Sequence, residues 1–181
     1  TKSYETKKNL DNKYYSQYSN PLVHFAGKEL NIKILELNKL KSLKKREYAY
    51  HNTVSIDFIK YLPLIKAKLK MIFRIRKKST NINLLKDELD IINLEKDLTI
   101  LNETSKSFEI ILKKLNPKVV YLVCFYDMYS MAISLACHRL KIKVVEYQHG
   151  FLNDYYSMYT NWNNLPSQGY ELIPDIFWMW S

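Results

Sequence analysis

The clearest hydrophobic pattern lies in the C-terminal third of the chain. Residues 119–125 form a continuous apolar run, which is typical of a strand covered on both faces of a sheet. A helical pattern follows at 129–140, and 143–147 has the pattern of a second short strand. Strand, helix and strand of this length predict a βαβ unit with a parallel sheet. Residues 173–180 are expected to add another strand.

Residues 14–37 show the pattern of a first α/β repeat. A helix is expected over 19–30, with Ser19 or Asn20 as its cap and Pro21 in its first turn. Residues 32–37 then alternate like a short strand. The polar, Lys- and Asn-rich residues 1–13 are expected to be frayed.

Residues 38–116 are expected to be mostly helical. The first helix begins near residue 58, because apolar residues recur there at spacings of three and four; they are Phe58, Leu62, Ile65, Leu69, Ile72 and Phe73. Pro63 belongs in its first turn or marks a kink. Two further helices are expected at 83–95 and 98–115.

The fold class predicted is therefore a single Rossmann-like α/β domain, a parallel sheet flanked by helices, with a helical insertion around residues 58–115 and a βαβ core at 117–181.

The net charge of the chain says less about its function than the magnitude of that charge suggests. The net charge is +10, but abundant Lys, Asn, Ile and Tyr together are what an AT-rich coding sequence produces. A basic excess favours phosphates, membrane surfaces or nucleic acids without choosing among them. Residues 60–78 contain eight basic side chains and no acidic one. Their helix is either a surface that contacts an anionic membrane or a core-packing helix with a solvated lysine face, and the compositional bias favours the second.

The compartment expected is the cytoplasm, with peripheral contact at the inner face of the membrane as the alternative. Cys124 and Cys137 lie inside apolar runs, which does not resemble a disulfide framework. No signal peptide is visible, and no apolar stretch approaches the roughly 18 residues of a spanning helix.

The candidate site is the edge of the sheet at which the predicted strands end, because ligands of open parallel sheets bind there. Asp127 follows the first strand of the βαβ unit, and Gln148-His149-Gly150 follows the second. His149 suits a general base, Gln148 a polar contact, and Gly150 a sharp turn or close approach to a ligand. The alternatives are that His149 only forms a hydrogen bond within its own loop, that Gly150 only allows the turn, and that Asp127 caps a helix.

The loop after Gly150 is rich in aromatic residues. Tyr155 and Tyr156 are candidate substrate-binding residues among Phe151, Tyr155, Tyr156, Tyr159 and Trp162. Aromatic faces with hydroxyls suit stacking against sugars or bases. The alternative, favoured for at least half of these residues, is packing over the sheet edge.

Several chemistries find no support in the sequence. His24, His51, His138 and His149 have no zinc-like spacing with cysteines or acidic residues. Three glycines in all leave no Gly-rich phosphate loop, and there is no Gly-x-Ser-x-Gly elbow. No metal or bound cofactor is expected.

Three segments together resemble bacterial surface-polysaccharide glycosyltransferases of the GT-B type. They are Val-Val-Glu-Tyr-Gln-His-Gly at 144–150, Gly-Tyr-Glu at 169–171 and Pro-Asp-Ile-Phe-Trp-Met-Trp at 174–180. Residues 14–36 are similar to the first α/β repeat of those enzymes. The likeness covers about half of the chain.

The resemblance implies the N-terminal, acceptor-side half of an enzyme that transfers a sugar from a nucleotide-sugar donor to a capsule, lipopolysaccharide or similar lipid-linked glycan. His149 would be the base or donor-contacting residue. The C-terminal nucleotide-sugar domain is not in this sequence, so the chain is expected to be inactive alone. The alternative is a non-catalytic α/β module that binds a protein or nucleic acid, although no nucleic-acid motif supports the latter.

Overall fold

The computed structural model describes the chain in two compact units, Thr1–Phe58 and Ile59–Ser181, which are taken separately below. It describes residues 6–8, 13–16, 18–26, 29–37, 47–78, 86–148, 150, 158–160, 163, 166–167 and 169–179, without the side chains of 6–8, 71–78 and 86–92. Most of the segment expected to be frayed, residues 1–13, lies outside the described residues. The single-domain organisation remains a prediction.

Within its described residues, the first unit contains two small sheets and one helix. β1 (Thr6–Lys8) pairs antiparallel with β2 (Tyr14–Ser16), and helix α1 (Ser19–Ala26) follows. β3 (Ile34–Glu36) pairs in parallel with β4 (Thr53–Ser55). The helix and strand expected within 14–37 are therefore confirmed.

The start of α1 is fixed by two neighbouring polar side chains. Ser16 Oγ accepts a hydrogen bond from Ser19 N at 3.2 Å, and Asn20 Oδ1 accepts one from Ser16 N at 2.9 Å. Pro21 lies in the first turn, as expected. Val23 of this helix is buried, whereas Phe25 is 81% exposed.

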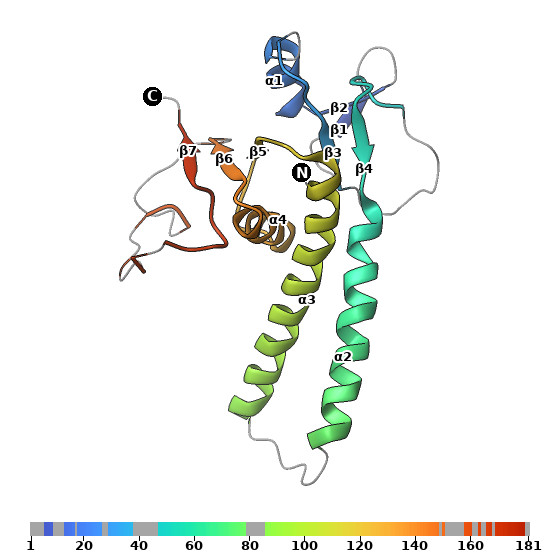
Figure 1. Cartoon of the computed structure of the whole chain (residues 1–181), viewed down its shortest axis with the longest axis vertical. Helices are drawn as coiled ribbons and strands as arrows, with labels where there is room; N and C mark the ends of the chain where they lie inside the picture. The colour runs from blue at the N-terminus through green and yellow to red at the C-terminus, as the bar shows by residue number, and fades with distance from the viewer. Residues whose placement is uncertain are drawn as a thin grey trace. The chain divides into compact units, whose positions relative to one another are not determined.

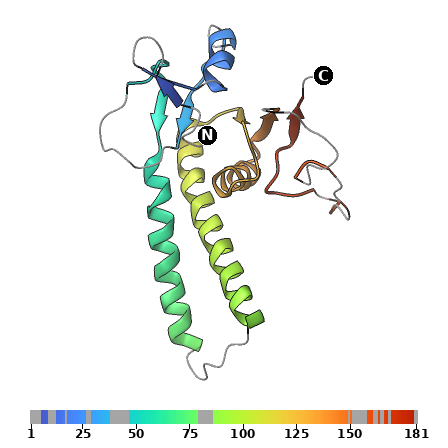
Figure 2. The same ribbon diagram turned by 180° about the vertical axis from the view of Figure 1, so that it is seen from behind.

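The second unit begins with helices. A 3-10 turn, η1 (Asp57–Lys60), spans the boundary between the units and leads into α2 (Leu62–Lys78). α3 (Lys86–Leu115) runs back beside α2, as both views show (Figures 1 and 2). Pro63 lies in the first turn of α2, as expected. The two separate helices predicted at 83–95 and 98–115 are wrong: within the described residues they form one helix of 30 residues.

The rest of the second unit is a parallel βαβ unit with one added strand. β5 (Val119–Leu122), α4 (Met128–Arg139) and β6 (Lys143–Tyr147) follow one another, and β7 (Ile176–Trp178) pairs with the other side of β6. All pairings in this sheet are parallel. The structure is thus α/β, with short parallel sheets flanked by helices. β5 is shorter than the predicted strand and is not covered on both faces, since Tyr121 is 44% exposed.

α3 and α4 pack through a mixture of apolar and small polar side chains. Phe108 and Leu112 of α3 and Ala132, Ala136 and Cys137 of α4 are buried. Thr104 is also buried, and its hydroxyl donates to the carbonyl of Ile100 in the preceding turn at 2.7 Å. Because the helix itself satisfies this hydroxyl, the residue packs without leaving a buried polar group unbonded.

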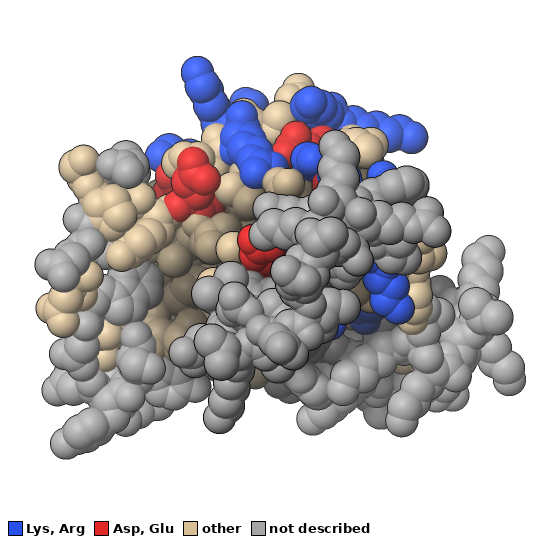
Figure 3. Space-filling model, turned by 90° about the horizontal axis from the view of Figure 1, so that it is seen from below, with Lys and Arg blue, Asp and Glu red and all other residues tan. Residues whose placement is uncertain are grey.

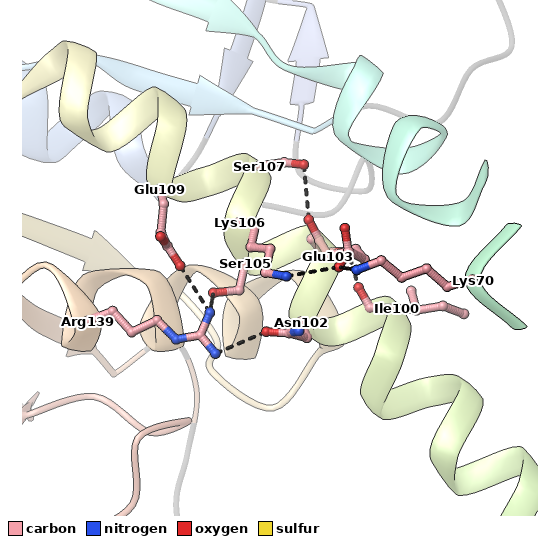
Figure 4. Close-up of polar contacts among 10 residues, drawn as sticks. Lys70, Ile100, Asn102, Glu103, Ser105, Lys106, Ser107, Glu109 and Arg139 are labelled. Carbon is pink, nitrogen blue, oxygen red and sulfur yellow. Dashed lines mark hydrogen bonds and ion pairs between the residues drawn. The ribbon is translucent and has the colours of Figure 1, made fainter. Parts of the chain in front are cut away.

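Polar contacts connect α3 to both neighbouring helices (Figure 4). Lys70 of α2 bonds the buried Glu103 of α3, which also accepts from Lys106 at 3.2 Å. The hydrogen bond from Lys70 is the main reason that the pKa of Glu103 is lowered, against the opposing effect of burial. At the end of α4, the Arg139 guanidinium donates to Glu109 Oε1 and to Asn102 Oδ1, each at 3.0 Å. Red acidic side chains lie among the blue basic ones along the upper edge of the view in Figure 3, so part of the positive charge of the described residues is offset locally.

Candidate functional site

The edge at which β5, β6 and β7 end carries two of the residues predicted from the sequence, Asp127 after β5 and Gln148 after β6. Tyr147 pairs with Trp178 at the end of β6, and the N–H of Gln148 donates to the carbonyl of Trp178 at 2.8 Å. Gln148 therefore continues beside β7 for one residue as the chain leaves the sheet. Within this motif the structure describes Gln148 and Gly150; His149 lies outside the described residues, as do Tyr155 and Tyr156.

The described part of the motif makes a contact within its own loop. Gln148 Nε2 donates to the carbonyl of Gly150 at 2.8 Å. A Cβ added at Gly150 would meet no heavy atom within 4 Å. Among the described residues, no neighbouring atom would therefore clash with a side chain at position 150.

Asp127 has a structural task at the start of α4. Its Oδ1 accepts from the backbone N–H of Tyr129 at 2.9 Å and of Ser130 at 3.3 Å, and its Oδ2 accepts from the Ser130 hydroxyl at 2.8 Å. These contacts make it the N-cap of the helix. The alternative interpretation of Asp127 as a cap accounts for both carboxylate oxygens.

The most unusual group near this edge is the side chain of Glu146, which was not predicted from the sequence. It lies on the central strand β6, level with Leu122 of β5 and Phe177 of β7, and is 2% exposed. The Tyr159 hydroxyl donates to its Oε1 at 2.5 Å. Burial raises the pKa of Glu146 to about 7, although the hydrogen bonds from Tyr159 and from the backbone N–H of Phe125 act in the opposite direction.

Aromatic rings account for the dry surroundings of this carboxyl group. The Tyr159 ring packs edge-on against Phe125 at 5.3 Å, Phe177 at 5.7 Å and Tyr126 at 6.1 Å between centroids. Burial, followed by the hydrogen bond to Glu146, raises the pKa of Tyr159. Tyr159 therefore follows the expectation of packing over the sheet edge; the other four aromatic residues named for this loop lie outside the described residues.

Glu146 joins three separate segments: β6, the residues after β5 and the turn at 158–160. With its carboxyl enclosed, it is suited to positioning the edge rather than to touching a ligand. A signal for it was present in the sequence, because a glutamate inside the apolar strand Val-Val-Glu-Tyr must find buried polar partners. Which partner it finds depends on contacts distant in sequence, so Tyr159 was not predictable as its donor.

Asp175, part of the Pro-Asp-Ile-Phe segment, fixes the opposite end of the strands. Its Oδ2 accepts from the backbone N–H of Val144 at 2.8 Å, and its Oδ1 pairs with Lys143 Nζ at 2.9 Å. Burial opposes ionisation of Asp175, but the bonds from Lys143 and Val144 outweigh it and lower its pKa. This segment thus sets the alignment of β7 with β6.

Among the described residues, no group of three or more His, Cys, Asp or Glu side chains is arranged to hold a metal ion. Across the same part of the chain, no helix combines the length and apolar character needed to cross a membrane. Cys124 and Cys137 are both free thiols, and burial raises the pKa of each.

Comparisons with protein-family models, with curated proteins and with solved structures found no match to this chain.

Proposed function

We propose that this chain is the acceptor-side part of a glycosyltransferase that moves a sugar from a nucleotide-sugar donor to a surface polysaccharide or lipid-linked glycan. The observation that carries the proposal is the parallel order β5-β6-β7 with Gln148 leaving β6 at the carboxyl edge. Ligands of open parallel sheets bind beyond this edge. The segments similar to GT-B transferases, 144–150 and 174–180, supply two of these three strands.

The reaction assigned to the site needs one proton acceptor. As an acceptor hydroxyl attacks the anomeric carbon of the donor sugar, His149 takes the hydroxyl proton. The bond from that carbon to the phosphate oxygen breaks, and the nucleotide leaves with the bonding electron pair. Gln148 and Gly150 shape the loop, and Asp127 and Glu146 hold the neighbouring segments.

The packing around Glu146 supports the positioning part of this proposal. A base must be held within hydrogen-bonding reach of the hydroxyl that it deprotonates. Glu146 lies on β6, three residues before His149 in the sequence, and bonds both Tyr159 and the backbone of Phe125. These bonds anchor the end of β6, the strand that precedes Gln148-His149-Gly150 in the sequence.

The proposal is tested in the cell that carries the gene. Disruption of the gene should remove or shorten a surface polysaccharide, and the wild-type gene supplied in trans should restore it. Complementation with His149→Ala should fail, whereas His138→Ala, which changes the half-exposed histidine at the end of α4, should succeed. An unchanged polysaccharide after disruption would contradict the proposal.

A further inference from the structure

An exposed apolar stripe runs along the first half of α2. It consists of Leu62, Ile65 and Leu69, which are 45%, 56% and 51% exposed. Their spacings of three and four place them on one face of the helix. The sequence favours a core-packing helix with these residues inward, and that interpretation is wrong for all three.

The packing of α2 is carried by smaller residues on another face. Pro63 and Ala67 are buried, and Ile59 just before the helix is fully buried. The contact with α3 includes the bond from Lys70 to Glu103. In this part of α2, Pro63 and Ala67 are therefore buried, whereas the larger side chains of Leu62, Ile65 and Leu69 face outward.

Lysines lie on both sides of the exposed stripe. At about 3.6 residues per turn, Lys66 falls on one side of it and Lys68 on the other, and both are exposed. From residue 60 to 78 the chain carries eight basic residues and no acidic one. A partner complementary to this helix is therefore apolar in the middle and anionic at its borders.

We propose that the exposed stripe and its flanking lysines form a docking surface for an anionic lipid bilayer. The aliphatic side chains enter the boundary between headgroups and acyl chains, and the lysines meet the anionic headgroups. This inference goes beyond the proposed function and does not depend on it.

Two other partners fit the surface less well. A nucleic acid that binds without a sequence motif uses aromatic rings for stacking between cations, whereas the exposed stripe is aliphatic. A second copy of the chain, joined stripe to stripe, would bring two sets of lysines together without acidic partners from α2, and like charges in an interface oppose association. Of these three partners, the bilayer alone offers both an apolar layer and the opposite charge.

The test is co-flotation of the full chain with vesicles of phosphatidylcholine, alone or with roughly 30% phosphatidylserine, at low and high salt. The chain should bind the anionic vesicles and be released by salt. Lys66→Gln with Lys68→Gln should lower the partition coefficient about 25-fold, about fivefold for each charge. Ile65→Asp with Leu69→Asp should reduce it at least as much.

The matched control is Leu94→Asp with Leu98→Asp on α3. These residues are 60% and 52% exposed and have the same spacing as Ile65 and Leu69, but Glu95 and Asp97 are their neighbours in sequence. This variant should bind like the wild type, and circular dichroism should show equal helix content in all variants.

Three results would overturn the proposal. The first is wild-type protein that does not bind anionic vesicles. The second is a stripe variant, Ile65→Asp with Leu69→Asp, that binds them as tightly as the wild type. The third is an alternative partner when vesicle binding is absent. Tight binding of an oligonucleotide would then assign the surface to nucleic acid. A dimer in light scattering that the stripe variant dissociates would assign it to a second copy.

Discussion

The Tyr159 hydroxyl donates a hydrogen bond to the buried carboxyl group of Glu146. The two residues are 13 positions apart, one on the central strand and the other in the turn at 158–160. Glu146, whose pKa burial raises to about 7, precedes the proposed base His149 by three residues in the sequence. The stability of the sheet edge should therefore respond to pH in the physiological range.

Glu146 should make the folded protein less stable as pH rises. Its pKa is raised from 4.5 to about 7, so between these values the folded state holds the proton more tightly than the unfolded state. Its contribution is fully present below pH 4.5 and is lost as pH rises through 7, a loss of up to roughly 3 kcal/mol. Urea unfolding followed by tryptophan fluorescence should show this slope in the wild type and lose it in Glu146→Gln.

The control for this measurement is Glu103→Gln. The pKa of Glu103 is lowered, so its contribution is present above 4.5 and is lost as pH falls further. That variant should lose a constant amount of stability above pH 4.5 and should change the pH slope only in the acid limb. A pH slope between 4.5 and 7 that survives in Glu146→Gln would show that another group titrates there.

Tyr159→Phe should shift the same transition to higher pH. The tyrosine bond lowers the pKa of Glu146, so removing it leaves burial less opposed. At pH 8 the variant should lose about 1–2 kcal/mol of unfolding free energy, because a buried acceptor loses its donor. Tyr170→Phe, in the exposed segment before β7, should change stability by less than about 0.5 kcal/mol. Equal effects of the two substitutions would contradict the role given to Tyr159.

Asp127→Ala should destabilise the protein by about 1 kcal/mol through loss of the N-cap of α4. Asp127→Ser keeps an oxygen for the same N–H groups and should retain most of that stability. Sugar transfer by the complete gene product should follow stability in both variants. If Asp127→Ser folds normally but loses transfer, the carboxylate contacts substrate and is more than a cap.

Arg139→Lys should lower the unfolding free energy by about 0.5–1 kcal/mol. Lysine cannot reproduce the planar fork that bonds Asn102 and Glu109 together, and partial exposure of the pair limits the effect. Lys113→Gln, an exposed change in the last turn of α3, is the control and should be neutral in urea unfolding. A neutral Arg139→Lys would mean that solvent screens the contact between α3 and α4.

The elements best predicted from the sequence were those with an unambiguous apolar pattern. β6 has the predicted limits of 143–147, and α4 begins and ends one residue before the predicted helix. α3 was divided wrongly because polar residues at Glu95–Asp97 interrupt its apolar spacing. Glutamate, lysine and leucine are nevertheless good helix formers, so the helix continues with those residues toward solvent.

Burial was harder to predict than secondary structure. Thr104 and Ser107 are buried in α3 while Leu98 is exposed, although leucine is the more hydrophobic residue. Hydroxyls that bond the preceding turn behave as small core groups, whereas leucine is buried only where a neighbouring element covers it. Contacts of that kind, like the bond from Tyr159 to Glu146, depend on elements far apart in the chain.

The most direct test of the proposed function is sugar transfer by the purified complete gene product carrying His149→Ala. The rate should fall by about 10²–10⁴-fold, as expected for loss of a general base, with unchanged urea unfolding. His138→Ala should transfer at the wild-type rate. Near-normal transfer by a folded His149→Ala protein would contradict the assignment of the base and the functional role of this sheet edge.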